Sequence, residues 1–263
     1  MKIEDLRSYL SCLGNTAIAF SGGTDSGFLL KIAHDLLGEK VLAITVCSAF
    51  FPKSERIEAH EFCRKNSIRQ IEIETDILSC SSVRKNPENR CYICKKEIFI
   101  KIKAAAAQNG FTAVCDGTNM DDEGDYRPGL KALLELGIKN PLRECRFSKS
   151  DIRKYSKEMG LNTWKKPSLA CLATRIPYGE EITEKKLFMV EHAELMLHEM
   201  GFDQLRVRIY KENLARIEVI PSQMQKIFDQ KEYVVLSLKK IGFTYVTLDL
   251  AGYRTGSMNE VLQ

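Results

Sequence analysis

A glycine-rich segment follows the first apolar run of the chain, at 16–20, and precedes an apolar helical pattern. Its residues are Ser21, Gly22, Gly23, Thr24, Asp25 and Ser26. A strand that ends in two glycines and opens a helix lets backbone N–H groups and the positive end of the helix dipole converge on an anion, for which phosphate is the natural ligand. The segment matches neither G-x-x-x-x-G-K-S/T, since it has no lysine, nor G-x-G-x-x-G. Taken alone, it is equally explained by a tight strand-to-helix turn that Ser26 caps.

Three of the nine cysteines occur in contexts that favour chemistry. Cys91 and Cys94 form a C-x-x-C pair just before a predicted helix, and Cys171 lies in an apolar stretch between Pro167 and Pro177. A lone C-x-x-C fits a redox pair, half of a zinc site or part of an iron–sulfur cluster, and it does not decide among them.

The remaining cysteines sit singly in apolar or strand-like stretches, where a thiol behaves as a small hydrophobe. They are Cys12, Cys47, Cys63, Cys80, Cys115 and Cys145. Because the total is odd and the chain shows no export signal, reduced thiols are expected and a disulfide framework is not.

Arginines in the C-terminal half form a second pattern that suits an anion. Arg206 and Arg208 alternate on a predicted strand and therefore point to the same side. Two guanidinium groups on one face suit a phosphate, although salt bridges on a solvated sheet face explain the same pattern. Arg254 lies in a Gly-Tyr-Arg sequence, where a glycine-flanked loop can bring its side chain to a ligand.

The elements that must position these residues alternate between strands and helices in the first half of the chain. Short apolar runs predict buried strands at 16–20, 41–46, 70–73 and 112–115. Helical patterns separate them at 27–37, 54–66 and 95–108. This alternation predicts an α/β fold with a parallel sheet, in which ligands bind beyond the carboxyl ends of the strands.

The alternation breaks between 164 and 179, where prolines and a glycine surround an apolar centre. We therefore predict a first domain at 1–172 and a second, small α+β domain at 173–263. The second is expected to contain a helix at 183–200 and a helical region at 221–241. Its strands are predicted at 204–210, 214–220 and 244–250.

Length and composition are those of an ordinary globular protein with one large or two modest domains. The chain has 263 residues, of which 44% are hydrophobic and 28% charged. No apolar run approaches the roughly 18 residues of a membrane span, and the charged start does not resemble a secretory signal, so a cytoplasmic protein is expected. The net charge of +4 is too small to indicate nucleic acid, whereas an anionic small molecule fits.

The segment that begins at Ser21, at the end of the first predicted strand, resembles the PP-loop ATP pyrophosphatase superfamily. The resemblance implies an enzyme that cleaves ATP between the α and β phosphates and transfers AMP to an oxygen of its substrate. It also implies that the turn holds the departing pyrophosphate with the help of Mg²⁺. Asp116 and Gly117, after the fourth predicted strand, and Arg127 are then expected to line the ATP cleft.

Three further stretches, at 124–129, 167–179 and 252–260, make the chain similar over nearly its full length to the LarE family. The resemblance implies a sulfur transferase that adenylates a carboxylate of pyridinium-3,5-biscarboxylic acid mononucleotide and converts it to a thiocarboxylate. The catalytic cysteine would be Cys171, which in the sacrificial type gives up its sulfur and becomes dehydroalanine. A thiolate is a suitable nucleophile once AMP has made the carboxylate oxygen a good leaving group.

The same resemblance assigns roles in the second domain. Arg206, Arg208 and Arg254 would bind the substrate phosphate. Glu194 and Glu218 match acidic positions for metal or substrate, although each is also explained as a surface carboxylate. A homo-oligomer is implied as well.

With the C-x-x-C pair beside Cys171, the chain resembles the LarE subgroup in which three cysteines hold a [4Fe-4S] cluster. Cys91, Cys94 and Cys171 would be the ligands, and the open iron would deliver a sulfide to the activated carboxylate. We favour this cluster over a sacrificial Cys171. A structural zinc site that recruits Cys80 is the third alternative.

Other functions are weaker explanations of these motifs. A tRNA thiolase of the same superfamily would require a basic surface and usually an RNA-binding module, and neither is evident. An ammonia-using amidotransferase or synthetase would leave the three cysteines idle. A nucleotide sensor without catalysis would bind ATP but release no pyrophosphate, so pyrophosphate release separates it from an adenylating enzyme.

Overall fold

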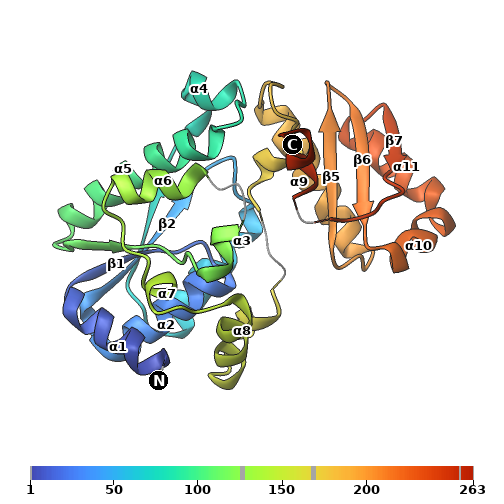
Figure 1. Ribbon diagram of the computed structural model, residues 1–263. Coiled ribbons are helices and arrows are strands. Elements are labelled where there is room, and N and C mark those ends of the chain that lie inside the picture. The colour runs from blue at the N-terminus through green and yellow to red at the C-terminus, as the bar shows by residue number, and fades with distance from the viewer. Residues whose placement is uncertain (1, 125–127, 167–169, 255, 263) are drawn as a thin grey trace. The chain divides into compact units, whose positions relative to one another are not determined.

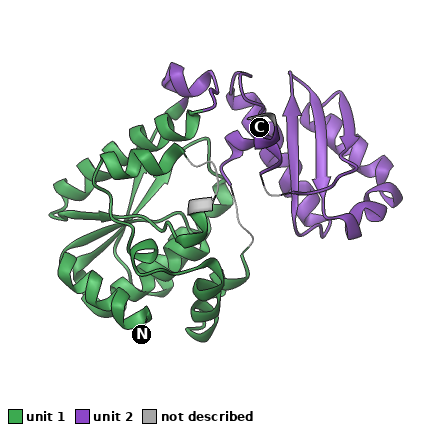
Figure 2. Ribbon diagram, in the orientation of Figure 1, with its two compact units in different colours: residues 1–77, 89–169 green, residues 78–88, 170–263 purple. Residues whose placement is uncertain are grey.

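The structure, a computed structural model, describes residues 2–124, 128–166, 170–254 and 256–262. The chain forms two compact units (Figure 2). The first comprises Met1–Ile77 and Asn89–Leu169, and the second Leu78–Glu88 and Ala170–Gln263. The short segment Leu78–Glu88, which the sequence analysis includes in the first domain, therefore packs with the second unit.

The first unit is built on a parallel sheet of four strands in the order β3-β2-β1-β4 (Figure 1). The strands are β1 (Thr16–Ala19), β2 (Val41–Cys47), β3 (Gln70–Glu74) and β4 (Ala113–Cys115). The central strands β1 and β2 are almost fully buried, which explains their continuous apolar sequences.

Helices cover both faces of this sheet (Figure 1). They are α1 (Lys2–Leu13), α2 (Thr24–Leu37), α3 (Lys53–Lys65), α5 (Arg90–Gln108), α6 (Pro128–Glu135), α7 (Pro141–Glu144) and α8 (Lys149–Glu158). The face under α1 and α2 holds an apolar core in which Phe28, Phe147 and Tyr155 form a ring cluster. That core fixes α2, whose first turn carries Asp25 and Ser26.

The second unit contains a mixed sheet in the order β5-β6-β7. Strands β5 (Leu205–Tyr210) and β6 (Leu214–Val219) are antiparallel, whereas β6 and β7 (Tyr245–Leu248) are parallel. Helix α9 (Glu184–Glu199) packs on β5, α11 (Lys231–Ile241) packs on α9 and β7, and α10 (Met224–Asp229) precedes α11. The short α4 (Ser81–Arg84) and two 3₁₀ segments, η5 (Leu172–Arg175) and η7 (Ser257–Leu262), complete the elements that matter for the site.

Asn86 ties Leu78–Glu88 to the second unit. Its side-chain amide donates hydrogen bonds to the carbonyls of Ile176 (3.1 Å) and Pro177 (2.7 Å). Its own carbonyl accepts from the N–H of Gly179 at 2.9 Å. Asn86 is fully buried at a φ of 54°, a left-handed conformation that asparagine tolerates better than most residues.

The predicted fold class and the strands of both units are confirmed, with ends that differ by at most two residues. One helix was predicted wrongly: α5 begins at Arg90, so the C-x-x-C pair occupies the second and fifth residues of the helix and does not precede it. None of the described helices is long and apolar enough to cross a membrane.

Candidate functional site

The glycine-rich turn connects the end of β1 to the start of α2. Gly22 has a φ of +74°, and a Cβ there would lie 3.1 Å from the Glu55 carbonyl oxygen and 3.2 Å from the Ala59 Cβ. Only glycine fits this left-handed, crowded position without strain. Gly23 is the N-cap of α2 and forms no side-chain cap hydrogen bond, so Ser26 does not cap the helix as the alternative explanation supposes. Because glycine has no side chain, Gly23 cannot cap the first N–H groups of α2. These groups can therefore donate to a bound anion.

Asp25 lies in the first turn of α2 and pairs with Lys149 at the start of α8. Its other oxygen, Oδ1, is buried and has no hydrogen-bond partner among the described residues. Burial raises the pKa of Asp25 above its ordinary value, and the neighbouring Lys149 opposes that rise. A partly buried carboxylate with one unpaired oxygen beside a lysine fits a site that Mg²⁺ and phosphate oxygens complete, because Mg²⁺ is commonly held by one or two carboxylates together with substrate phosphates.

The loop after β4 lies against this turn because β1 and β4 are parallel neighbours. A Cβ on Gly117 would lie 2.9 Å from the backbone nitrogen of Ser26. Asp116, one residue before, accepts hydrogen bonds from the Thr118 N–H (2.7 Å) and the Asn140 side-chain amide (3.0 Å). The structure therefore brings together the glycine-rich turn, Asp116 and Gly117. Arg127 lies outside the described residues.

Substituting Gly117 tests how closely these two loops must approach. Gly117→Ala is expected to lower the free energy of unfolding by about 1–3 kcal/mol, because the added methyl group has no room against the Ser26 backbone. Urea denaturation of the full chain measures this loss. Gly27→Ala on α2 is the matched control, since its Cβ would make ordinary contacts of 3.6 Å or more. Equal stabilities of the two variants would contradict the close approach.

Two lysines near the turn were not singled out by the sequence analysis. Lys149 contacts Asp25 across 124 positions of sequence, and Lys166 donates to the Gly22 carbonyl at 2.9 Å and pairs with Glu58. Both therefore place positive charge beside the turn, which favours a polyphosphate. No local sequence pattern predicts these contacts, because a single lysine in a polar stretch has the same sequence context as an ordinary surface lysine.

The three chemically interesting cysteines are divided between the units. Cys91 and Cys94, both half-buried, lie one turn apart on α5 and so on the same side of that helix. Cys171, also half-buried, is the N-cap residue of η5 in the second unit. Over the described ranges, no group of three or more His, Cys, Asp or Glu side chains is arranged to hold a metal ion.

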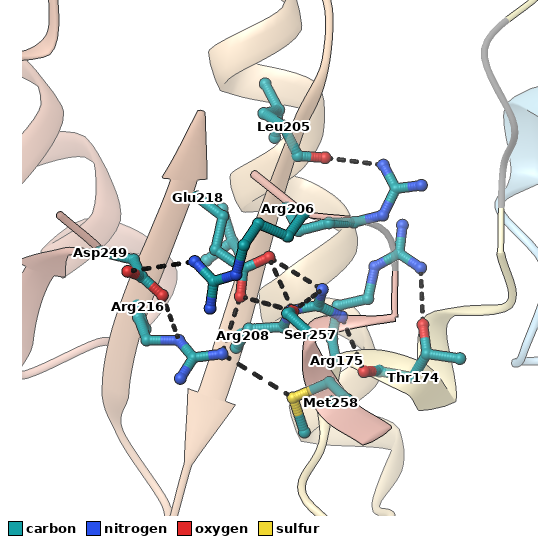
Figure 3. Close-up of polar contacts among 12 residues, drawn as sticks. Thr174, Arg175, Leu205, Arg206, Arg208, Arg216, Glu218, Asp249, Ser257 and Met258 are labelled. Carbon is teal, nitrogen blue, oxygen red and sulfur yellow. Dashed lines mark hydrogen bonds and ion pairs between the residues drawn. The ribbon is translucent and has the colours of Figure 1, made fainter. Parts of the chain in front are cut away.

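Three arginines and one glutamate project from one face of the second sheet (Figure 3). Arg206 stands opposite Glu218 and Arg208 opposite Arg216 in the antiparallel pair of β5 and β6, so all four project from the same face. Arg208 donates to Glu218 through Nε (3.1 Å) and Nη2 (2.8 Å), and Arg216 donates to it at 2.7 Å. The Ser257 hydroxyl lies 3.2 Å from the same carboxylate.

Glu218 and Glu194 are not the surface carboxylates that the simpler explanation supposes. Both are buried and ionised, and desolvation is the largest influence on each. The guanidinium groups around Glu194, chiefly Arg175, outweigh that penalty and hold its pKa below the ordinary value. Arg208 and Arg216 do the same for Glu218. In the structure each glutamate thus serves as counter-ion to buried arginines.

Arg206 is a buried cation in this network. Its Nη1 donates to the Leu205 carbonyl at 2.7 Å (Figure 3). Its guanidinium also lies over the Tyr253 ring at 5.3 Å. Burial and the nearby Arg175 lower its pKa, which means that the positive charge is destabilised where it lies. A bound anion would relieve that cost.

Arg254 lies at the edge of the same region and is partly exposed. It pairs with Glu260 at 3.1 Å and donates to the Gly252 carbonyl at 3.3 Å. The structure therefore brings Arg206 and Arg208 together on one strand, with Arg254 on the segment that follows β7.

No protein-family model matches the sequence. It is 41% identical over 263 residues to an uncharacterised protein of Synechocystis sp., covering 99% of this chain and 98% of that protein. It is 37% identical over 262 residues to the pyridinium-3,5-bisthiocarboxylic acid mononucleotide synthase of Lactiplantibacillus plantarum, covering 99% and 95%.

A more distant similarity concerns a GMP synthase. Over 195 residues the chain is 32% identical to one of the subunits of the glutamine-hydrolysing GMP synthase of Thermoplasma volcanium, covering 67% of this chain and 61% of that protein. Together with the parallel sheet and the turn after β1, this similarity supports a PP-loop fold.

Proposed function

The chain belongs to the LarE family, that of the pyridinium-3,5-bisthiocarboxylic acid mononucleotide synthases, and on that premise we propose that it is an ATP-dependent sulfur transferase. Its substrate would be pyridinium-3,5-biscarboxylic acid mononucleotide, whose carboxylate it adenylates and converts to a thiocarboxylate. The similarity over 99% of the chain carries this proposal, because it includes both the glycine-rich turn and Cys171.

The first unit would perform the adenylation. The turn at Gly22 and Gly23, with the start of α2, receives the pyrophosphate part of ATP. Asp25 would hold Mg²⁺, and Lys149, which pairs with Asp25, would contribute positive charge beside the phosphates. A carboxylate oxygen of the substrate would attack the α-phosphorus, the bond from that phosphorus to the α,β-bridging oxygen would break, and pyrophosphate would leave with its electron pair. The buried and unsatisfied Oδ1 of Asp25 is the feature that supports this role.

The second unit would bind the nucleotide phosphate of the substrate. Arg206, Arg208 and Arg254 are the proposed contacts, and the lowered pKa of the buried Arg206 supports an anion there. Glu194 and Glu218 neutralise the neighbouring guanidinium groups, so they would shape this site rather than hold a metal ion.

Cys91, Cys94 and Cys171 would hold a [4Fe-4S] cluster. The donor chemistry fits, since three thiolates leave one iron open, and two of them lie on a single helical turn. When bound, the cluster would supply inorganic sulfide to the activated carboxylate, while the chain's own residues hold the adenylate and exclude water. The alternative is that Cys171 attacks the acyl adenylate, displaces AMP and then loses its own sulfur.

The substrate assay tests the proposed reaction. Wild-type protein incubated anaerobically with Mg²⁺, ATP, sulfide and pyridinium-3,5-biscarboxylic acid mononucleotide should release pyrophosphate and form a thiocarboxylate that is visible by mass spectrometry. ATP alone is the control and should release little pyrophosphate. Binding of ATP without pyrophosphate release would contradict the proposal and indicate a nucleotide sensor.

Metal analysis separates the three roles of the cysteines. We expect about four irons and four sulfides per chain in anaerobic wild-type protein and their loss in Cys91→Ala, Cys94→Ala and Cys171→Ala. Metal-free, active wild type would instead support the sacrificial Cys171, with dehydroalanine at that position after turnover. Stoichiometric zinc, lost in Cys80→Ala, would make the C-x-x-C pair structural.

A further inference from the structure

Arg175 is the largest fully buried side chain in the described part of the molecule, with 1% of its surface exposed. It follows Cys171 by four residues and ends η5. Its Nε and Nη2 donate to the two oxygens of Glu194 at 2.9 Å and 2.7 Å, a bidentate ion pair. We propose that Arg175, held by Glu194, is a positioning residue that fixes the direction of the Cys171 side chain.

The remaining guanidinium nitrogen contacts both peptide groups that flank Cys171. Nη1 donates to the Ala170 carbonyl at 2.6 Å and to the Cys171 carbonyl at 3.1 Å. The first carbonyl belongs to the peptide bond before the Cys171 Cα and the second to the one after it. Fixing both peptide planes fixes φ and ψ of Cys171, which are −55° and 146°, and therefore the direction of its Cα–Cβ bond.

Thr174 adds a second tie to the same carbonyl. Its N–H donates to the Cys171 carbonyl at 3.0 Å and its hydroxyl at 2.8 Å, while the Arg175 Nη1 lies 3.0 Å from that hydroxyl. Arg208 in turn donates to the Thr174 carbonyl at 2.9 Å. The turn that carries Cys171 is thus held by hydrogen bonds from Arg175 and Thr174 to its carbonyls, and by the hydrogen bond from Arg208 on β5.

Arg175 and Glu194 together form what we call the clamp on Cys171, and Glu194 connects it to α9 and β5 of the second unit. It lies on α9, and its Oε1 also accepts the backbone N–H of Val207 at 2.9 Å on β5. Replacing a buried ion pair by apolar residues often costs no stability, so stability alone is a weak reason for burying one here. The hydrogen bonds from Arg175 to the carbonyls on both sides of Cys171 suggest another reason for burying the pair, namely to fix the conformation of Cys171.

Lysine cannot replace Arg175 in this arrangement. Its single ammonium group can keep the charge beside Glu194 but cannot also reach the carbonyls on both sides of Cys171, because a guanidinium presents five donors in a planar fork. Arg175→Lys should therefore loosen the turn without leaving Glu194 unpaired. Arg84→Lys is the matched control, since Arg84 is exposed in the same unit and pairs with Glu181.

The test combines hydrogen exchange with two rate measurements on the full chain, as prepared anaerobically. In Arg175→Lys, exchange in a peptide that covers 170–176 should accelerate, while exchange in β5 and β6 stays as in wild type. Because the clamp acts on Cys171 and the inference rests on the proposed function, thiocarboxylate formation should fall about tenfold or more. Pyrophosphate release should change less than about twofold, since the first unit performs it.

Three results would overturn the proposed role of Arg175. Unchanged exchange at 170–176, or thiocarboxylate formation at the wild-type rate, would overturn the clamp. Equal losses in both rates would also overturn it, because they indicate a general structural role. If Arg175→Lys does not fold, Thr174→Val removes the hydroxyl that donates to the Cys171 carbonyl. It should slow thiocarboxylate formation by a smaller factor and leave pyrophosphate release unchanged. A wild type that forms no thiocarboxylate while exchange still responds would refute the proposed function but retain the clamp.

Discussion

Asp25→Ala is expected to reduce substrate-dependent pyrophosphate release by about 100-fold or more. The substitution removes the carboxylate whose Oδ1 is buried without a described partner and which Lys149 contacts. Without it, Mg²⁺ loses a protein ligand, and the negative charge that builds up on the departing pyrophosphate is less well neutralised. A coupled phosphate assay at saturating ATP, with the mononucleotide substrate present, measures the effect.

The control lies on the same helix. Asp35 pairs with Lys31 four residues earlier on α2 and is partly exposed, so Asp35→Ala removes a carboxylate from α2 without touching the turn. It should release pyrophosphate at the wild-type rate, because such exposed pairs contribute little to stability. Full activity of Asp25→Ala would remove the glycine-rich turn from the proposed chemistry.

Cys171→Ser should separate the two halves of the reaction. Pyrophosphate release is expected to continue, because the adenylating residues belong to the first unit. Thiocarboxylate formation should fall below detection, because a hydroxyl neither binds iron as a thiolate does nor provides sulfur to the substrate. This result is expected whether Cys171 is a cluster ligand or a sacrificial donor. Mass spectrometry of the nucleotide products, together with a pyrophosphate assay, measures both halves.

Two further cysteine variants complete this experiment. Cys12→Ser replaces an exposed thiol on α1 and should behave as wild type. Cys80→Ser should also retain activity unless Cys80 belongs to a zinc site. Thiocarboxylate formation by Cys171→Ser at a rate near that of wild type would show that sulfur reaches the substrate by another route.

Much of the fold could be predicted because its signals are local. The strands of the first sheet are short apolar runs, and β5 alternates apolar residues with Arg206 and Arg208, so each pattern reveals its own element. The glycine-rich turn was also recognisable, since Gly22 needs both a left-handed backbone and a small side chain.

The contacts that complete the site depend on residues far apart in sequence. Lys149 reaches Asp25 across 124 positions, and Arg175 reaches Glu194 on a different helix. No periodicity predicts either pair. The start of α5 was misplaced although Asn89, a residue type that often caps helices, directly precedes Arg90; its side chain forms no cap hydrogen bond in the structure.

The segment Leu78–Glu88 affects how the chain can be cut into fragments and how it folds during synthesis. The chain enters the second unit at 78, returns to the first at 89 and enters the second again at 170, so neither unit is a continuous stretch. A fragment that begins at 170 would lack Asn86 and leave the carbonyls of Ile176 and Pro177 without its amide. On the ribosome, the hydrogen-bond partners of Asn86 do not exist until Ile176, Pro177 and Gly179 have been made, so Leu78–Glu88 cannot join the second unit before then.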